Sequence, residues 1–498
     1  MKKNNSSMKA VGGFLAKNNV TILFIILCIF AYLASGTTLT FLLPELFTRI
    51  GRNTFMVLSL LIPVVAGLGL NFGIVIGAIS AQMAIFVVLL CDFSGMFGFL
   101  MCIVICTPLA ILFGFLIGKL FNSMKGTEMI GGLVTGYFSD GIYQLIFLFI
   151  LGGVIPIYNN KLIISTGVGV KNTMDLKDTL KYALDDVPML AVLKVAFFAI
   201  LAVSAITLVY RLIKKQDLQL KKVLRVLIPA AAAYALSFIP FVSKFLSTTR
   251  LLLLNAIEIG VVFSVLYNAY KLIREKRANK SAPVWKRIVY VGIAGALYAM
   301  TYIPQLYAAL IAVRLPVLTY ICIGGLCLAI PAFLNTKLGQ DMRTVGQSRS
   351  VATSAGIDVN KTRIIATIIS TVLASYGHLI SLQNIGTVAT YGAHQQVGLY
   401  AIAALLVGGA SVHRATVKNA LLGIVLFHTL FILAPIAGKA LVGNAQIGEY
   451  FRVFVAYGVI ALALAMHAWN DSGAKRKKKN GEKKAGENKA EQPVAQNG

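Results

Sequence analysis

Long runs of apolar residues dominate this chain, and they constrain its fold more than any other feature. A helix needs about 20 mostly apolar residues to cross the hydrocarbon core of a bilayer. Runs of this length recur along most of the sequence, so it predicts an all-α polytopic membrane protein with about 14 transmembrane helices. The predicted spans are 18–36, 54–71, 73–91, 97–120, 129–155, 190–212, 226–246, 251–270, 288–311, 315–335, 364–384, 397–412, 419–436 and 448–469.

The composition excludes a soluble enzyme. Only 13% of the 498 residues are charged, whereas soluble domains carry about 25%. The formal net charge of +28 would suggest nucleic-acid binding in a soluble chain. Here the basic residues lie between apolar runs, so membrane topology explains them and no nucleic-acid partner is expected.

The distribution of basic residues predicts that both termini lie inside the cell. With an even number of spans, 34 of the 46 Lys and Arg residues fall in inner segments, as the positive-inside rule requires. The largest outer loop is then 159–189, where Met174–Asp186 could form an amphipathic helix on the outer surface. Residues 471–498 read as a disordered basic tail attracted to membrane lipid.

Motifs for cofactor or metal chemistry are missing from the sequence. The six cysteines lie in or at the ends of apolar runs without the spacing of a zinc site, so we expect no metal. Gly114 and Gly118 precede Lys119 with a spacing one residue short of a phosphate-binding loop, and small-residue helix packing explains them better. We therefore expect a non-enzymatic protein without a cofactor.

Two acidic residues stand out within predicted spans, where burying a charge is costly and therefore indicates a function. Asp140 stands in span 129–155 with Tyr143 and Gln144 beside it, and Glu258 stands in span 251–270. Either could line a solute path or bind an ion. The alternative function is therefore an ion-coupled secondary transporter with Asp140 or Glu258 as the ion site.

A polar segment follows span 364–384 and separates it from the next apolar run. It contains Gln383, Tyr391, His394 and Gln395 among glycines and threonines. Irregular backbone at membrane depth is tolerated only where it is buried in protein or lines a cavity. The segment is therefore either an ordinary outer loop or a re-entrant lining of the solute path.

The inner segment 336–363 is polar and contains a short run of small residues, SRSVATSAG. This run predicts a short helix over about 347–356, closed by Gly356. Small side chains would present a surface that fits the groove of another protein.

At this segment the chain resembles the permease subunits of ABC importers for ribose, nucleosides and branched-chain amino acids. The resemblance continues through Gly398–Ser411, through Gly69–Gly77 and through Glu128–Leu133, the last being similar to the nucleoside branch. The matching positions of the inner segment are Thr336, Leu338, Gly339, Arg343, Val345, Gly346, Ala352, Ala355, Gly356, Ile357 and Val359.

The resemblance implies a permease in the plasma membrane of a prokaryote that carries a nucleoside or a pentose-type sugar. Its partners would be an ATP-binding subunit, an extracytoplasmic solute-binding protein and a second permease chain. The helix near 347–356 would couple to the ATPase through Arg343, Gly346, Ser350, Ala352 and Gly356. Ser350 departs from the family pattern, since relatives often have a Glu there.

Relatives have about ten spans, so the resemblance divides this chain into a ten-helix core and four inserted helices. Residues 1–158 and 315–470 would form two halves of the core in opposite orientations, and 190–314 would be the insertion. An inverted repeat places solute near the interface of its halves. The expected lining residues are Asn71, Asp140, Tyr143, Gln144, Gln383, Tyr391, His394 and Gln395.

Overall fold

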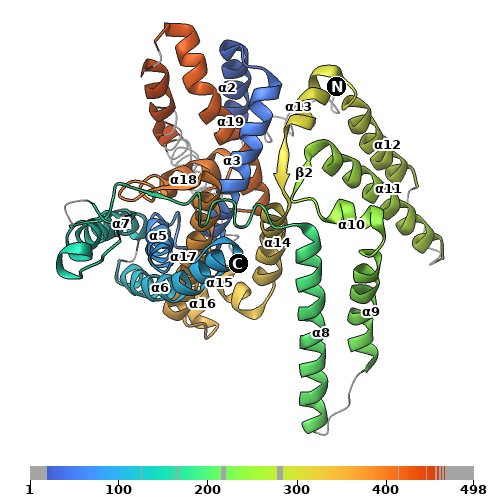
Figure 1. Ribbon diagram of the computed structural model, residues 1–498, viewed down its shortest axis with the longest axis horizontal. Helices are drawn as coiled ribbons and strands as arrows, with labels where there is room; N and C mark the ends of the chain where they lie inside the picture. Colours follow the sequence, from blue (N-terminus) through green and yellow to red (C-terminus); the bar gives the residue numbers. More distant parts are fainter. Residues whose placement is uncertain are drawn as a thin grey trace, which may run out of the picture. The chain divides into compact units, whose positions relative to one another are not determined.

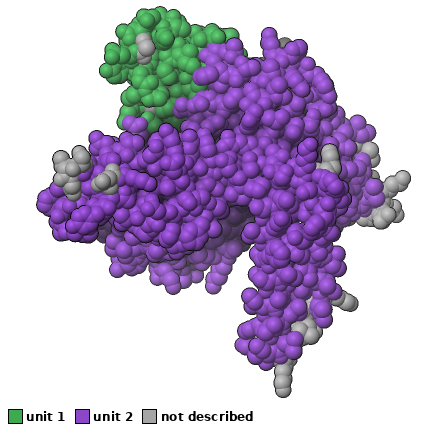
Figure 2. Space-filling model, viewed as in Figure 1, with its two compact units in different colours: residues 1–36, 399–498 green, residues 37–398 purple. Residues whose placement is uncertain are grey.

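The computed structural model describes residues 19–465, except 125, 160, 165–167, 215–219, 278–283, 413, 445, 455–456, 459–460 and 463–464. The predicted basic tail, 471–498, lies outside the described residues. The described chain is mostly helical, and it divides into two units that Figure 2 colours separately: residues 1–36 with 399–498, and residues 37–398.

The first unit is built on α2 (Asn19–Ser35), α19 (Val417–Val442) and most of α18 (Val397–Val407). Gly408 and Gly423 meet so closely that a Cβ on either would overlap the opposing main chain. Cys28 is a buried packing residue, as expected, and its Sγ donates to the carbonyl of Leu426 at 3.3 Å. A capping box formed by Thr416 and Asn419 begins α19.

The second unit contains the remaining helices and strands (Figure 1). In chain order these are α3 (Leu39–Ser59), α4 (Leu61–Val65), α5 (Ile74–Leu90), α6 (Gly95–Ser123), α7 (Glu128–Leu145), the π-helical η1 (Ile146–Val154), β1 (Thr173–Asp175), α8 (Met189–Ile213), α9 (Leu220–Leu236), α10 (Pro240–Leu246), β2 (Arg250–Leu252), α11 (Leu253–Arg277), α12 (Val284–Met300), α13 (Pro304–Ala312), β3 (Arg314–Pro316), α14 (Val317–Leu334), α15 (Lys337–Gln347), α16 (Arg349–Ser354), α17 (Val359–Ile385) and β4 (Thr387–Ala389).

Helix α17 is the centre of this unit, where it packs against α3, α5 and α6. Glycines permit the close approach: a Cβ at Gly77 of α5 would lie 2.5 Å from the carbonyl oxygen of Thr371. On α6, a Cβ at Gly114 or Gly118 would lie 2.8 or 2.9 Å from a Cα of α17. The expectation that Gly114 and Gly118 serve helix packing is confirmed.

Two short antiparallel pairs join distant parts of the second unit. Strand β1 pairs with β4, so that Met174 lies opposite Val388, and β2 pairs with β3. The prediction of an amphipathic helix over Met174–Asp186 is wrong, because this stretch forms β1 and a series of turns. Its apolar residues at four-residue spacing, Leu176, Leu180 and Leu184, are buried against protein rather than turned toward lipid.

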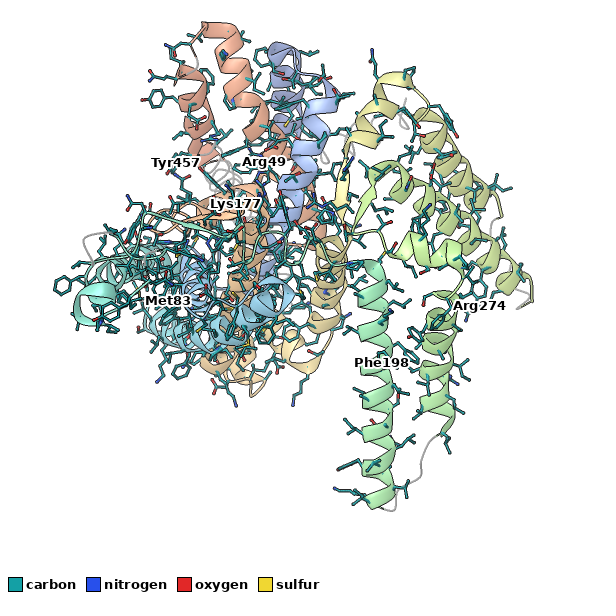
Figure 3. The ribbon with its side chains drawn as sticks, viewed as in Figure 1. Arg49, Met83, Lys177, Phe198, Arg274 and Tyr457 are labelled. Carbon is teal, nitrogen blue, oxygen red and sulfur yellow. The ribbon has the colours of Figure 1, made fainter. Side chains whose placement is uncertain are left out.

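The segment between the predicted core halves forms helices α8 to α13. Helices α8 and α9 contact through aromatic rings, where Phe197 stacks on Tyr234 at 4.6 Å and Phe198, labelled in Figure 3, lies 6.1 Å from it. Helices α11 and α12 also pack together. The predicted span 226–246 is broken by Pro240, and 288–311 is bent by 89° between α12 and α13.

Seven described helices are long and apolar enough to cross a membrane, or eight if the bent pair counts as one span. Four shorter apolar helices lie at Val20–Ser35, Ile74–Leu90, Val223–Leu236 and Val397–Val407. The chain is thus an all-α polytopic membrane protein. The predicted span 54–71 is not one helix: α3 starts at Leu39 and ends at Ser59, and the short α4 follows.

We predict that Gly118→Ala lowers the free energy of unfolding by about 1–3 kcal/mol, because the added methyl group meets the backbone of α17. Gly324→Ala is the control, since nothing lies within 4 Å of its Cβ position on α14. The control should be neutral or stabilising by about 0.5–1 kcal/mol, because alanine favours helix. Equal thermal stability of the two purified variants would contradict the packing described here.

Candidate solute path and coupling loop

Asp140 of α7 is half-buried and lies at the centre of a polar cluster. Gln144 lies one turn later on the same face and donates from Nε2 to both carboxylate oxygens at 3.2 Å. His394 Nε2 lies 2.7 Å from Asp140 Oδ1, and Gln395 Nε2 donates to Oδ2 at 3.0 Å. The structure therefore brings together four of the residues that the sequence assigned to the solute path.

The cluster continues inward through two residues that the sequence analysis missed. Gln82 Oε1 of α5 lies 2.9 Å from His394 Nδ1, and Gln82 Nε2 lies 3.3 Å from His378 Nε2 of α17. Gln82, His378 and His394 are all nearly inaccessible to solvent. Gln82 and His378 could have been found in the sequence as polar side chains within otherwise apolar spans, because such side chains need hydrogen-bond partners there.

The hydrogen bonds restrict the protons on this chain of groups. In one orientation of the Gln82 amide, its carbonyl oxygen accepts from His394 Nδ1. If His394 also donates from Nε2 to Asp140, both ring nitrogens carry a proton and the imidazole is cationic. With the Gln82 amide reversed, a neutral His394 donates to Asp140 from Nε2, and Gln82 accepts from His378 Nε2. Because His394 is completely buried, the neutral arrangement costs less free energy. The charge of Asp140 is then stabilised by three neutral donors.

Two tyrosines hold the segment that carries His394. Tyr143 stacks on Phe147 at 4.2 Å, meets His394 edge-on at 5.0 Å, and donates to the carbonyl of Thr390 at 3.0 Å. Tyr391 donates to the carbonyl of Val170 at 2.6 Å. These bonds, with the β1–β4 pair, satisfy backbone groups of irregular chain and fix His394 against α7.

The structure places the other predicted path residues elsewhere. Gln383 donates to Asp185 Oδ1 at 2.9 Å and so belongs to a different cluster. Asn71 is buried in the break between α4 and α5, where its Oδ1 accepts from the backbone of Gly73 at 3.0 Å. Glu258 lies on α11, and among the described residues it forms no hydrogen bond or ion pair with the Asp140 cluster.

The inner segment 336–363 folds into two capped helices, α15 and α16. Thr336 caps α15, and the side chain of Ser348 accepts from the backbone of Val351 to cap α16. Gly356 has φ +75°, and Ile357 N donates to the carbonyl of Ala352 at 3.0 Å, the bonding of a Schellman motif. The short helix and its closing glycine are confirmed.

Some residues of the inner segment 336–363 pack against the rest of the chain, and others are exposed to solvent. Ala352 is buried, whereas Ser350 and Gly356 are exposed and Arg343 is half-buried. Gly346 lies against α4, where a Cβ would overlap the carbonyl of Val65, so this glycine serves packing within the chain.

Glu128 ties the loop to the rest of the unit. Its carboxylate is 8% exposed and pairs with Arg349 of α16 at 2.6 Å and with Arg363 of α17 at 2.5 Å. The backbone N–H of Gly126 also donates to it, at 2.9 Å. Arg363 is only 1% exposed, so this pair keeps a buried cation from being uncompensated.

The comparisons with known proteins agree with this arrangement. A family profile described as "Branched-chain amino acid transport system / permease component" matches residues 223–464, just under half of the chain. This match supports the resemblance to ABC transporter permeases that the inner loop shows, and the chain is a multi-pass membrane protein. Neither a curated protein nor a solved structure matches the chain significantly.

We predict that Asp140→Asn and His394→Phe, which keeps a ring but has no donor, are non-additive in stability. Each removes the same charge-assisted bond, so their interaction free energy should be about 1–2 kcal/mol. Thermal unfolding of both single variants and the double variant in detergent measures it. In the control pair Asp178→Asn, which changes an exposed carboxylate, takes the place of Asp140→Asn. The changes in unfolding free energy of the control pair should add within about 0.5 kcal/mol. Additivity in both pairs would refute the bond.

Proposed function

We propose that this chain is the permease subunit of an ABC importer that carries a small polar solute, a nucleoside or a pentose-type sugar. A separate subunit hydrolyses ATP, an extracytoplasmic protein delivers the solute, and a second permease chain completes the path. In this proposal both termini face the cytoplasm of a prokaryote, and residues 190–314 are inserted between the core halves 1–158 and 315–470. The observation that carries the proposal is the geometry of α16.

Helix α16 has the form of a docking element. Its buried side rests on the chain through Ala352, while Val351 is 59% exposed and Thr353 and Ser354 are also exposed. The exposed side chains are small, so the helix can enter a groove of a partner. An exposed apolar side chain framed by polar ones is typical of a protein interface. The ATP-binding subunit is the partner that this permease family implies.

The ion pairs of Glu128 provide a route from this helix to the polar cluster. Glu128 begins α7 and holds Arg349 of α16, and Asp140 lies twelve residues later on the same helix, about 18 Å away. A displacement of α16 by the ATPase would therefore pull on the helix that carries Asp140. This linkage supports a mechanism in which ATP hydrolysis moves α7 and opens or closes the path.

The chemistry of the Asp140 cluster supports a polar, uncharged solute. Carboxylate, amide and imidazole groups can accept from and donate to the hydroxyl groups of a sugar or the amide edge of a base. The charge of Asp140 is already met by donors from His394, Gln144 and Gln395, so a solute would exchange these bonds for its own. Such an exchange permits weak, reversible binding, as passage through a membrane requires.

Docking of the ATPase is tested at Val351. We predict that Val351→Arg lowers co-purification of an ATP-hydrolysing subunit at least about tenfold, because burial of a charge in an apolar contact costs more than 1.4 kcal/mol. Val351→Ala, which keeps the small surface, is the control and should retain the subunit. The readout is ATP hydrolysis by the complex captured from native membranes. If no ATPase accompanies the wild-type chain, the importer proposal fails.

Transport is tested at Asp140. We predict that Asp140→Asn reduces uptake of labelled nucleosides or pentoses about tenfold, because a charge-assisted network in the path is lost. Asp178→Asn should transport normally, and both variants should keep the ATPase. Uptake by the wild type should stop when ATP is depleted. Uptake that survives ATP depletion and follows a proton or sodium gradient would instead establish the ion-coupled transporter.

A further inference from the structure

A cavity of about 110 Å³ lies in the second unit at the end of α17 that carries Gln383 and Asn384. Its wall comes from α3, the turns before α8, β2, β3, α14 and α17. Three arginines line it: Arg52 of α3, Arg250 of β2 and Arg314 of β3. The β2–β3 pair, in which Arg250 lies opposite Pro316, holds the last two on adjacent strands.

The acidic residues at this cavity are already engaged by other groups. Asp185 is 1% exposed, and its carboxylate accepts from Thr319 at 2.5 Å, Gln383 at 2.9 Å and Asn384 at 2.5 Å. Asp186 pairs with Arg250 at 3.0 Å. Of the described residues that line the cavity, three carry a guanidinium group and one, Asp185, carries a carboxylate, which neutral donors already occupy.

Arg52 and Arg314 retain donors for a ligand. Arg52 is half-buried, and its Nε donates to the amide oxygen of Asn384 at 2.5 Å, a neutral partner. Glu45 and Asp185 lie near enough to stabilise its charge, but among the described residues neither forms an ion pair with it. Arg314 is exposed at the rim and, within the described residues, forms no ion pair. Guanidinium groups carry five N–H donors in a planar fork that matches a carboxylate or a phosphate.

The cavity lies at the opposite end of α17 from the inner loop. Arg363, which meets Glu128 near α16, precedes Gln383 by twenty residues, or about 30 Å along the helix. If the inner loop binds the ATPase, as proposed above, the cavity opens on the outer side. The inference of a ligand does not depend on that orientation, but its placement outside the cell rests on the proposed function.

We propose that this cavity is a binding site for one carboxylate group, held by Arg52 and Arg314 with Arg250 beside them. Its volume suits a small carboxylate with a few water molecules rather than a nucleotide. Two of the three arginines, Arg250 and Arg314, come from the segment 190–314. In this proposal that segment therefore has a role, because the predicted core alone would lack these two anion-binding groups. The carboxylate is either a free small acid or an acidic side chain of a protein that docks there.

The test uses arginine modification by phenylglyoxal on the purified chain in lipid nanodiscs, followed by peptide mass spectrometry. Acetate at roughly twice its Kd should slow modification of Arg52 and Arg314 about threefold, because occupancy protects by a factor of one plus the ligand ratio. Acetamide, its uncharged isostere, should not protect. Arg274 on α11, labelled in Figure 3, is the matched exposed control and should react at the same rate throughout.

Variants and a second probe distinguish the outcomes. Arg314→Gln, at the exposed rim, should fold normally and abolish protection of Arg52 by acetate. A capped peptide with a single Asp side chain that protects better than acetate identifies a protein ligand, and acetate alone identifies a free acid. If neither probe protects Arg52 or Arg314, the proposal is overturned. Because the assay uses the chain without an ATPase, this result leaves the importer proposal unaffected.

Discussion

The close packing of α17 is the constraint on which the rest of the second unit depends. Apolar burial gives little reason for helices to associate in lipid, so their packing relies on close contact and on polar groups that meet inside. Glycines on α5 and α6, and Gly377 of α17 against Met56, bring the backbones together. Most buried threonines and serines of α17 donate to carbonyls one turn back in the same chain. The larger buried polar residues Arg363, His378 and Gln383 need partners on other segments.

Three carboxylates supply those partners at three levels of α17; Glu128 and Asp185 are buried, and Asp140 is half-buried. Glu128 meets Arg363, Asp140 reaches His378 through His394 and Gln82, and Asp185 meets Gln383. The chain has 18 acidic residues against 46 basic ones, so acids buried in this way are few. A buried charge is kept only where it is paired or hydrogen-bonded, because the free energy of burying it alone is prohibitive. The polar contacts therefore specify which helices lie beside α17.

The sequence was sufficient for the fold class and for the inner loop, but not for the grouping of polar residues. Apolar runs locate the helices because a segment that crosses the hydrocarbon core must be apolar and must satisfy its own backbone hydrogen bonds. Local capping determines where α16 ends, because Gly356 adopts a positive φ. Gln82 and His378 are 296 residues apart and meet only through tertiary packing, so no local pattern reveals them. Gln383 was grouped with His394 by proximity in sequence, yet the end of α17 at Gly386 separates them.

Helices α7 and α17 are linked at two of these levels, and this double linkage bears on how a transport cycle could work. Glu128 and Asp140, about 18 Å apart on α7, bond directly or through side chains to Arg363 and His378 of α17. Two links at that separation resist tilting of one helix against the other, so we expect the pair to move together while both links are intact. Motion that enters at Arg349 then reaches the Asp140 cluster without a hinge in α7. The second link runs through His394, so an opening between Asp140 and the 390–396 segment breaks that link and leaves the Glu128–Arg363 pair to join α7 to α17. Such an opening must also separate the rings of Tyr143 and His394.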